Sequence, residues 1–243
     1  MTKFKHDNKS LHNLESPNLI VPEVLKFITP KSVVDIGCGL GNFLHVFKQN
    51  GVEEILGVNG PWVEKELLFK YIDQEEFLEW DLEKEIVLDK KYDLAVNLEV
   101  AEHLNEKAAD TIVKTLVNAG EVVLFSAAIP LQGGQNHINE QPLTYWEEKF
   151  SKHGYVVHDI IRSVIWDNDK IPFWYRQNMV FIAPKEYTFK NNPVYSHVKN
   201  IVHPGLVQDK MNQIIELHHA KKKTSFYLKL FLKSLAISLG VKK

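Results

Sequence analysis

Two carboxylates and two histidines carry the most specific chemistry in this 243-residue chain. Glu99, Glu102 and His103 stand at positions i, i+3 and i+4, so a helix beginning here would carry all three side chains on one face. Carboxylates gathered in this way repel each other unless a cation joins them, and oxygen ligands combined with imidazole suit Mg2+, Mn2+ or Fe2+. His137 follows in a glycine-containing loop and is expected to supply a fourth ligand. The pattern predicts a divalent-metal site with His103 and His137 as candidate proton acceptors; the alternative is a metal-free site in which His137 is the general base.

A second site is predicted at the glycine-rich segment 33–42, Val-Val-Asp-Ile-Gly-Cys-Gly-Leu-Gly-Asn. It has the pattern of an apolar strand that turns on glycines and continues into a helix. Glycine lets the backbone approach a ligand closely, and the helix N-terminus offers unpaired N–H groups. A dinucleotide site would need its third glycine at position 42, where this chain has Asn. Asp35 would repel a pyrophosphate but attract an amino-acid ammonium group, so the segment favours a nucleoside cofactor that carries one.

This segment resembles the D-x-G-x-G-x-G signature of class I S-adenosylmethionine (SAM)-dependent methyltransferases. The resemblance implies SAM as the cofactor. Asn59 stands where the family usually has an acidic residue for the ribose hydroxyls, and it keeps one acceptor and one donor without the charge. Asp81 is similar to the acidic residue that the family places near the adenine amino group. The cofactor-binding residues expected on this basis are Asp35, Gly37, Cys38, Gly39, Gly41, Asn59, Asp81, Leu82 and Leu98.

Two later motifs resemble particular branches of the same family. The pattern E-x-x-E-H followed by a later His is similar to the metal-dependent catechol O-methyltransferases of the ubiquinone pathway and to small-RNA 3′-terminal 2′-O-methyltransferases, whose acceptors have adjacent hydroxyls. Segment 126–146 is similar to methyltransferases of bacterial sugar and surface-glycan pathways. An acceptor pocket is expected there, lined by Gln135, Asn136, Asn139, Tyr145 and Trp146.

These resemblances imply a SAM-dependent O-methyltransferase that acts on a sugar or glycan hydroxyl, assisted by Mg2+ or Mn2+. Three alternatives stay open: methylation of a small-RNA 3′ end, methylation of a catechol or quinone precursor, and a SAM-binding scaffold protein without catalysis. Nucleic acid is the less favoured partner, because the net charge of -2 gives no general attraction to it.

The predicted sites require a sheet whose strands end along one edge. Strands are predicted at 32–37, 54–59, 76–80, 92–98, 121–129, 155–161 and 178–183, with helical stretches between most of them. The early strands are apolar almost throughout, which is typical of strands covered on both faces. The pattern predicts an α/β fold with a doubly wound, mainly parallel seven-stranded sheet, the Rossmann-like methyltransferase fold, whose ligands gather at the carboxyl ends of the strands. A capping box formed by Thr144 and Glu147 is expected to start one of the helices.

Two parts of the chain are expected, a methyltransferase domain at 1–185 and a C-terminal extension at 186–243 with a basic amphipathic helix. Residues 221–243 contain seven Lys and no acidic residue, interspersed with Phe and Leu. Such a segment is expected to contact an anionic membrane surface, or to dock on its own domain or on a second copy. The sequence shows neither a signal pattern nor an apolar run long enough to span a bilayer, so a cytoplasmic location is expected. The single Cys38 excludes an intramolecular disulfide framework and is expected to pack inside the glycine turn.

Overall fold

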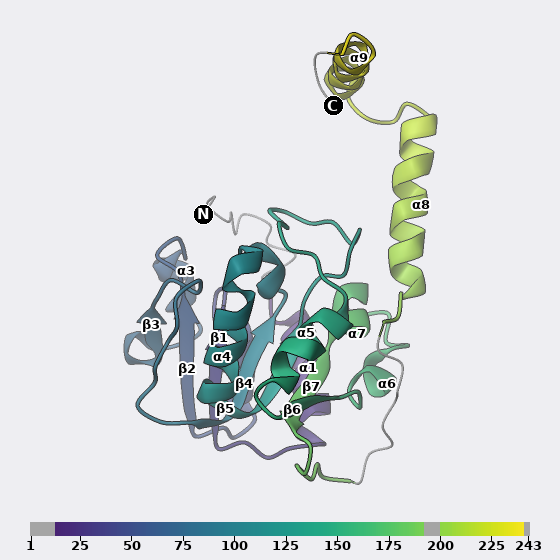
Figure 1. The fold of residues 1–243 in the computed structure, drawn as a ribbon. Helices are drawn as coiled ribbons and strands as arrows, with labels where there is room; N and C mark the ends of the chain where they lie inside the picture. The colour runs from purple at the N-terminus through teal and green to yellow at the C-terminus, as the bar shows by residue number, and fades with distance from the viewer. Residues whose placement is uncertain (1–12, 192–199, 241–243) are drawn as a thin grey trace. The chain divides into compact units, whose positions relative to one another are not determined.

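The computed structural model describes residues 13–191 and 200–240. It contains two compact units, Met1–Ile201 and Val202–Lys243. The first unit is built on a seven-stranded sheet of order β3-β2-β1-β4-β5-β7-β6 (Figure 1). Its strands are β1 (Ser32–Ile36), β2 (Glu54–Asn59), β3 (Phe77–Glu79), β4 (Tyr92–Leu98), β5 (Gly120–Ser126), β6 (Tyr155–His158) and β7 (Val180–Pro184). β7 runs antiparallel to both of its neighbours, β5 and β6, and the other strand pairs among the described residues are parallel, so the predicted doubly wound, mainly parallel sheet is confirmed.

Helices cover both faces of this sheet, and each face has its own core. Along β1, Val33 packs into one core and Val34 into the other, and the same alternation separates Leu124 from Phe125 on β5. Both faces of the central strands are therefore buried, which explains why these strands lack polar alternation. The helices of this unit are α1 (Glu15–Leu25), α2 (Asn42–Gln49), α3 (Lys65–Leu68), η1 (Gln74–Glu76), η2 (Ala101–His103), η3 (Glu106–Ala108), α4 (Ala109–Ala119), α5 (Leu143–Ser151), α6 (Arg162–Ile165) and α7 (Phe173–Asn178).

Some element boundaries differ from those predicted. The strand expected at 121–129 ends at Ser126, although Ala127 and Ala128 beyond it are buried. Burial of an apolar residue does not by itself require strand pairing, which is why the sequence pattern extended this strand too far. Beyond the domain boundary expected at 185, Phe189 is buried against Phe181, with ring centroids 5.1 Å apart.

The start of α5 also differs from the prediction. The expected capping box of Thr144 and Glu147 is wrong, because the helix begins at Leu143 with Pro142 in the N-cap position and no side-chain cap. Thr144 lies within the first turn, and its N–H donates to Asn200 Oδ1 at 3.4 Å. Proline at a helix start supplies a suitable φ without any side-chain hydrogen bond.

The described part of the second unit, residues 202–240, forms the helices α8 (Pro204–His218) and α9 (Thr224–Ser238). The Nδ1 atom of His203 caps α8 by accepting a hydrogen bond from the Gly205 N–H at 2.9 Å. Within the part of the chain that the structure describes, no helix is long and apolar enough to cross a membrane.

Candidate functional site

The glycine turn between β1 and α2 uses its glycines for two different purposes. Gly37, Gly39 and Gly41 all have positive φ, at 97°, 55° and 79°. A Cβ on Gly37 would lie 2.5 Å from Cγ2 of Val100, so this glycine permits close packing inside the protein. A Cβ on Gly39 would meet no atom within 4 Å. The backbone at Gly39 therefore borders open space, as a ligand approaching the main chain requires.

Asp35 lies at the carboxyl end of β1, directly before this turn, and is buried. Burial raises the pKa of its carboxyl group to about 8. Burial and the nearby Asp35 carboxylate also raise the pKa of the Cys38 thiol, so this cysteine is a poor nucleophile and serves packing. A buried carboxyl of this kind is expected to ionise readily only when a cationic group comes close to it.

The remaining predicted cofactor residues follow the neighbouring strands. Asn59 ends β2, and its Oδ1 accepts a hydrogen bond from the Gly60 N–H at 2.8 Å. Beyond β3, the Asp81 carboxylate accepts from the Glu83 N–H at 3.1 Å. Leu82 and Leu98 are buried. Because β3, β2, β1 and β4 are adjacent and parallel, the structure places these residues along the same edge of the sheet.

Three of the four residues predicted to bind a metal come together. Glu102, His103 and His137 each offer a ligand atom, and these atoms lie within 4.8 Å of one another. The two imidazole rings meet edge to face, with centroids 4.9 Å apart. The Glu102 side chain is fully buried, and neither carboxylate oxygen makes a hydrogen bond of normal geometry with a described residue, although the Ala128 backbone and the Glu99 carboxyl lie close enough to influence its pKa. A buried carboxylate without hydrogen bonds is costly, and a cation between it and the imidazoles would remove that cost.

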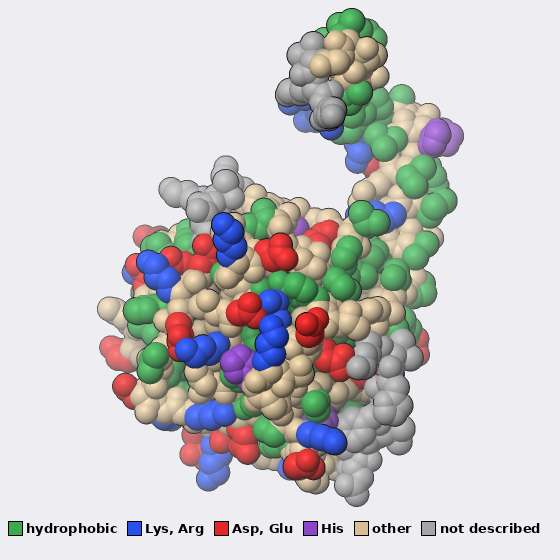
Figure 2. Space-filling model, viewed as in Figure 1, with side chains coloured by type: hydrophobic (Ala, Val, Ile, Leu, Met, Phe, Trp, Pro, Cys, Tyr) green, Lys and Arg blue, Asp and Glu red, His purple; other side chains and the backbone are tan. Residues whose placement is uncertain are grey.

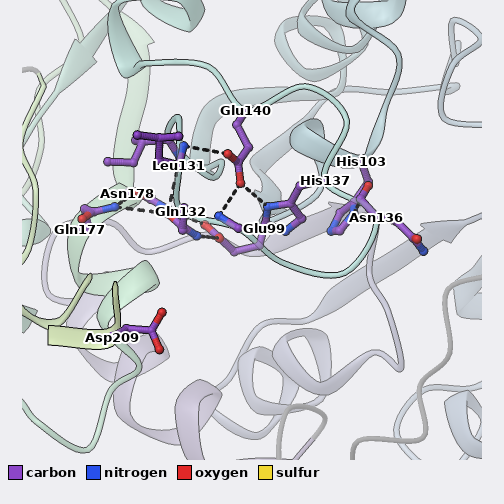
Figure 3. A network of polar contacts seen from close by, with 12 residues as sticks. Glu99, His103, Leu131, Gln132, Asn136, His137, Glu140, Gln177, Asn178 and Asp209 are labelled. Carbon is purple, nitrogen blue, oxygen red and sulfur yellow. Dashed lines mark hydrogen bonds and ion pairs between the residues drawn. The ribbon is translucent and has the colours of Figure 1, made fainter. Parts of the chain in front are cut away.

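Contacts outside this group hold both histidine rings, and Figure 3 shows the contact between His137 and Glu140. His137 Nδ1 lies 2.9 Å from Glu140 Oε1, and His103 Nδ1 lies 3.3 Å from the Asn136 carbonyl oxygen. Glu140 is held in turn by the N–H groups of Leu131 at 2.8 Å and Gly133 at 2.6 Å. Metal-binding histidines are commonly oriented by a carboxylate or a carbonyl in this way. Glu140 was not among the predicted site residues, although a carboxylate three residues after a candidate ligand is a usable signal.

The electrostatics of the group favour a bound cation. Burial, and then the neighbouring Glu99 carboxylate, raise the pKa of Glu102 well above its usual range. Burial and the nearby His137 lower the pKa of His103 to about 4. His103 is therefore neutral at physiological pH, which is the form that binds a metal. A divalent ion would lower the pKa of Glu102 and keep its carboxylate ionised.

Glu99 lies outside this candidate metal-binding group, contrary to the prediction from its spacing. The expected helix does not form there, because Glu99 has a φ of 54° and the chain then enters the short 3-10 turn η2. Its two carboxylate oxygens accept hydrogen bonds from Asn178 Nδ2 at 3.2 Å and Gln132 Nε2 at 3.1 Å (Figure 3). Asn178 ends α7, far from Glu99 in the sequence, so no local pattern could have identified this amide clamp.

The loop that carries His137 is attached to η2 through the main chain. The N–H groups of Ile138 and Asn139 donate to the carbonyl oxygen of Glu102, at 2.9 Å and 3.0 Å. A Cβ on Gly134 would lie 2.2 Å from Nε2 of His137, so only glycine leaves room for this ring. The expected proximity of the strand-four and strand-five segments is confirmed.

The residues predicted to line an acceptor pocket are distributed differently. Trp146 is a core residue, only 1% exposed, with its ring 5.5 Å from that of Phe125, so its assignment to the pocket is wrong. Trp146 lies on the apolar side of α5, which packs against the sheet. Asn136 contributes its backbone carbonyl to His103, and Asn139 keeps a buried Nδ2 without a partner among the described residues.

Comparison with known proteins agrees with this architecture. A family model described as a methyltransferase domain matches residues 12–159. No match is found among the curated proteins. Among solved structures, the methyltransferase domain of bacterial CtHen1-C has a TM-score of 0.50 and 22% identity, over 71% of this chain and 99% of that one. PKMT2 from Rickettsia typhi has a TM-score of 0.52 and 14% identity, over 74% of this chain and 55% of that one.

A further match is the O-methyltransferase NcsB1 from neocarzinostatin biosynthesis, at 15% identity and a TM-score of 0.48 over 63% of this chain. The present chain spans about half the length of that protein, covering 49% of it. The likenesses to CtHen1-C and PKMT2, at 22% and 14% identity, show the fold, and the family model, which covers more than half of the chain, shows the family. The chain therefore belongs to the methyltransferase-domain family.

Proposed function

We propose that this enzyme transfers the methyl group of SAM to a hydroxyl of a sugar or glycan, with a divalent cation held by Glu102, His103 and His137. The observation that carries the proposal is the Glu102 carboxylate. It is buried without a hydrogen bond of normal geometry to a described residue, and it lies beside two histidines whose rings are already held in place.

The cofactor half of the proposal rests on the edge formed by β1 to β4. SAM would supply an electrophilic methyl group on a sulfonium ion. The open space at Gly39 admits a ligand against the main chain, and the buried Asp35 carboxyl offers a partner for a cationic group. Asn59 and Asp81 follow the next two strands, where the ribose and adenine contacts are expected.

The proposed acceptor site is the candidate metal-binding group of Glu102, His103 and His137. A bound Mg2+ or Mn2+ would lower the pKa of a coordinated hydroxyl. Glu102 supplies the anionic ligand, His103 a neutral imidazole, and Glu140 holds His137 in the orientation that the site needs. In the metal-free alternative, His137 is the candidate proton acceptor, because its ring is oriented by a carboxylate.

The choice of a sugar or glycan is supported by the amide side chains of the 131–141 loop, including the unpartnered Nδ2 of Asn139. On the face shown in Figure 2, Lys and Arg side chains of the first unit are interspersed with Asp and Glu, whereas an RNA-binding surface is usually dominated by basic residues. An acceptor with two adjacent hydroxyls could chelate the cation, so a deoxy analogue that lacks the neighbouring hydroxyl should react more slowly.

Calorimetric titration with Mn2+ tests the metal site directly. The wild-type protein is expected to bind one ion tightly, and Glu102→Gln should weaken binding at least about 10-fold, because the anionic ligand is lost while the shape is kept. Glu106→Gln, at an exposed glutamate four residues on, is the matched control and should bind like the wild type. The unfolding free energy of the metal-free Glu102→Gln protein should stay close to that of the wild type, since the raised pKa already keeps the Glu102 side chain neutral without a cation and glutamine is neutral and of the same shape. Equal Mn2+ affinity in the wild type and Glu102→Gln would refute the site.

A further inference from the structure

The C-terminal helix α9 displays apolar side chains over most of its surface. None of its residues is buried, and eight large apolar residues along it and at its end are 39–69% exposed. They are Phe226, Leu228, Leu230, Phe231, Leu232, Leu235, Ile237 and Leu239. Contiguous apolar surface of this kind marks a surface that contacts another apolar phase or molecule.

The charged side chains of α9 and of the residues directly beside it in the sequence are all lysines. Residues 221–243 include seven Lys and no Asp or Glu. Lys221, Lys222 and Lys223 directly precede the helix, and Lys222 forms an ion pair with Glu216 of α8. Lys229 and Lys233 are four residues apart, so they lie on the same side of the helix. An anionic surface complements this arrangement.

The distribution of the apolar side chains around α9 favours contact with lipid over contact with a single partner helix. One side of the helix carries Leu228, Leu232, Leu235 and Leu239. Another side carries Phe226, Leu230 and Ile237. Lys229 and Lys233 lie between these two apolar sides. One partner helix would cover one of these sides and leave the other in water. Lipid can surround both sides while the lysine side chains extend to the headgroups.

We propose that α9 binds the surface of a membrane that contains anionic phospholipids and lies within its interface. The helix has 15 residues, so it is about 22 Å long at 1.5 Å per residue. This is shorter than the hydrocarbon core of a bilayer, which is about 30 Å thick. The lysines and the apolar side chains supply the two attractions that stable attachment to a membrane surface needs.

Sedimentation of the full chain with lipid vesicles tests this proposal. The wild type should sediment with vesicles of phosphatidylcholine mixed with phosphatidylglycerol, should bind vesicles of phosphatidylcholine alone much more weakly, and should dissociate from the mixed vesicles as salt is added. The double change Lys229→Glu and Lys233→Glu should weaken the binding roughly 30-fold or more, since each lysine near an anionic surface contributes about 1 kcal/mol.

A second double change, Phe231→Ser and Leu235→Ser, should also weaken vesicle binding, because it removes apolar side chains while keeping every lysine. The matched control is Val87→Ser, at an apolar residue of the first unit that is 85% exposed, which should bind like the wild type. SAM binding should be unchanged in all three proteins, which shows that the first unit is intact.

Three outcomes would overturn the proposal. The first is a wild-type protein that fails to sediment with the mixed vesicles, since α9 would then be covered by its own first unit or by a second copy. The second is equal binding to neutral and anionic vesicles. The third is a concentration-dependent dimer that Phe231→Ser and Leu235→Ser dissociate without any change in vesicle binding.

Discussion

Gly37 and Gly39 both have positive φ, but the structure requires glycine at the two positions for different reasons. Gly37 is needed because Val100 packs against it, whereas Gly39 faces open space. A change at Gly37 therefore tests packing, and a change at Gly39 tests the ligand site.

We expect Gly39→Val to abolish SAM binding in calorimetric titrations, because its side chain would fill the space next to the main chain. Gly154→Val is the matched control: Gly154 also has a positive φ, of 77°, and open space at its Cβ position. Both variants carry a comparable backbone strain of about 1–2 kcal/mol. If Gly39→Val folds and binds SAM as the wild type does, the glycine turn is not the cofactor site.

At the scale of elements, the candidate metal-binding group is assembled from one loop and one turn that the main chain connects. Glu102 and His103 lie on η2 after β4, and His137 lies in the loop after β5. The Ile138 and Asn139 N–H groups join the loop to the Glu102 carbonyl. The site is therefore expected to assemble only when this main-chain connection is made.

We expect Ile138→Pro to weaken Mn2+ binding about 10-fold or more and to lower the unfolding free energy by about 1–3 kcal/mol, because proline removes the N–H that donates to Glu102. Calorimetric titration and urea unfolding measure the two effects. Ile138→Ala keeps the N–H and truncates a side chain that is 60% exposed, so it should stay close to the wild type. An Ile138→Pro protein with wild-type Mn2+ affinity would show that the main-chain connection does not position His137.

At the scale of the whole molecule, carboxyl groups are buried where ligands are expected to bind, and their raised pKa values make the unfolding free energy depend on pH. The pKa of Asp35 is raised to about 8 in the folded protein from an ordinary value of 3.8. Burial also raises the pKa values of Glu99 and Glu102. The folded state therefore binds protons more strongly than the unfolded state at these groups. The stability that they contribute is present at low pH and lost as the pH rises.

For Asp35 alone, the ligand-free protein should lose at most about 5 kcal/mol of unfolding free energy between about pH 4 and pH 8. His103 acts in the opposite sense, since its folded pKa of about 4 lowers stability as the pH falls below 6.5. Asp35→Asn should therefore flatten the loss above pH 6.5, as measured by urea unfolding at a series of pH values. Parallel curves for the wild type and Asp35→Asn would show that Asp35 keeps an ordinary pKa.

Local features of the sequence were sufficient to predict the fold and part of the candidate site. Apolar runs such as Val122–Phe125 identify strands buried on both faces, and the glycine spacing identifies the turn between β1 and α2, because both signals depend on neighbouring residues. The proximity of Glu102, His103 and His137 could also be predicted, since parallel neighbouring strands end at the same edge of a sheet.

Only the tertiary structure decided which side chains complete the site. Glu99 shares the spacing of a ligand, yet its positive φ turns it toward the amides of Gln132 and Asn178. Trp146 is an aromatic residue of the kind that lines sugar-binding pockets, yet the packing of α5 on the sheet buries its ring against Phe125. These outcomes depend on contacts between segments far apart in the chain, whose geometry is set by the packing of the whole domain and leaves no periodic signal in the sequence.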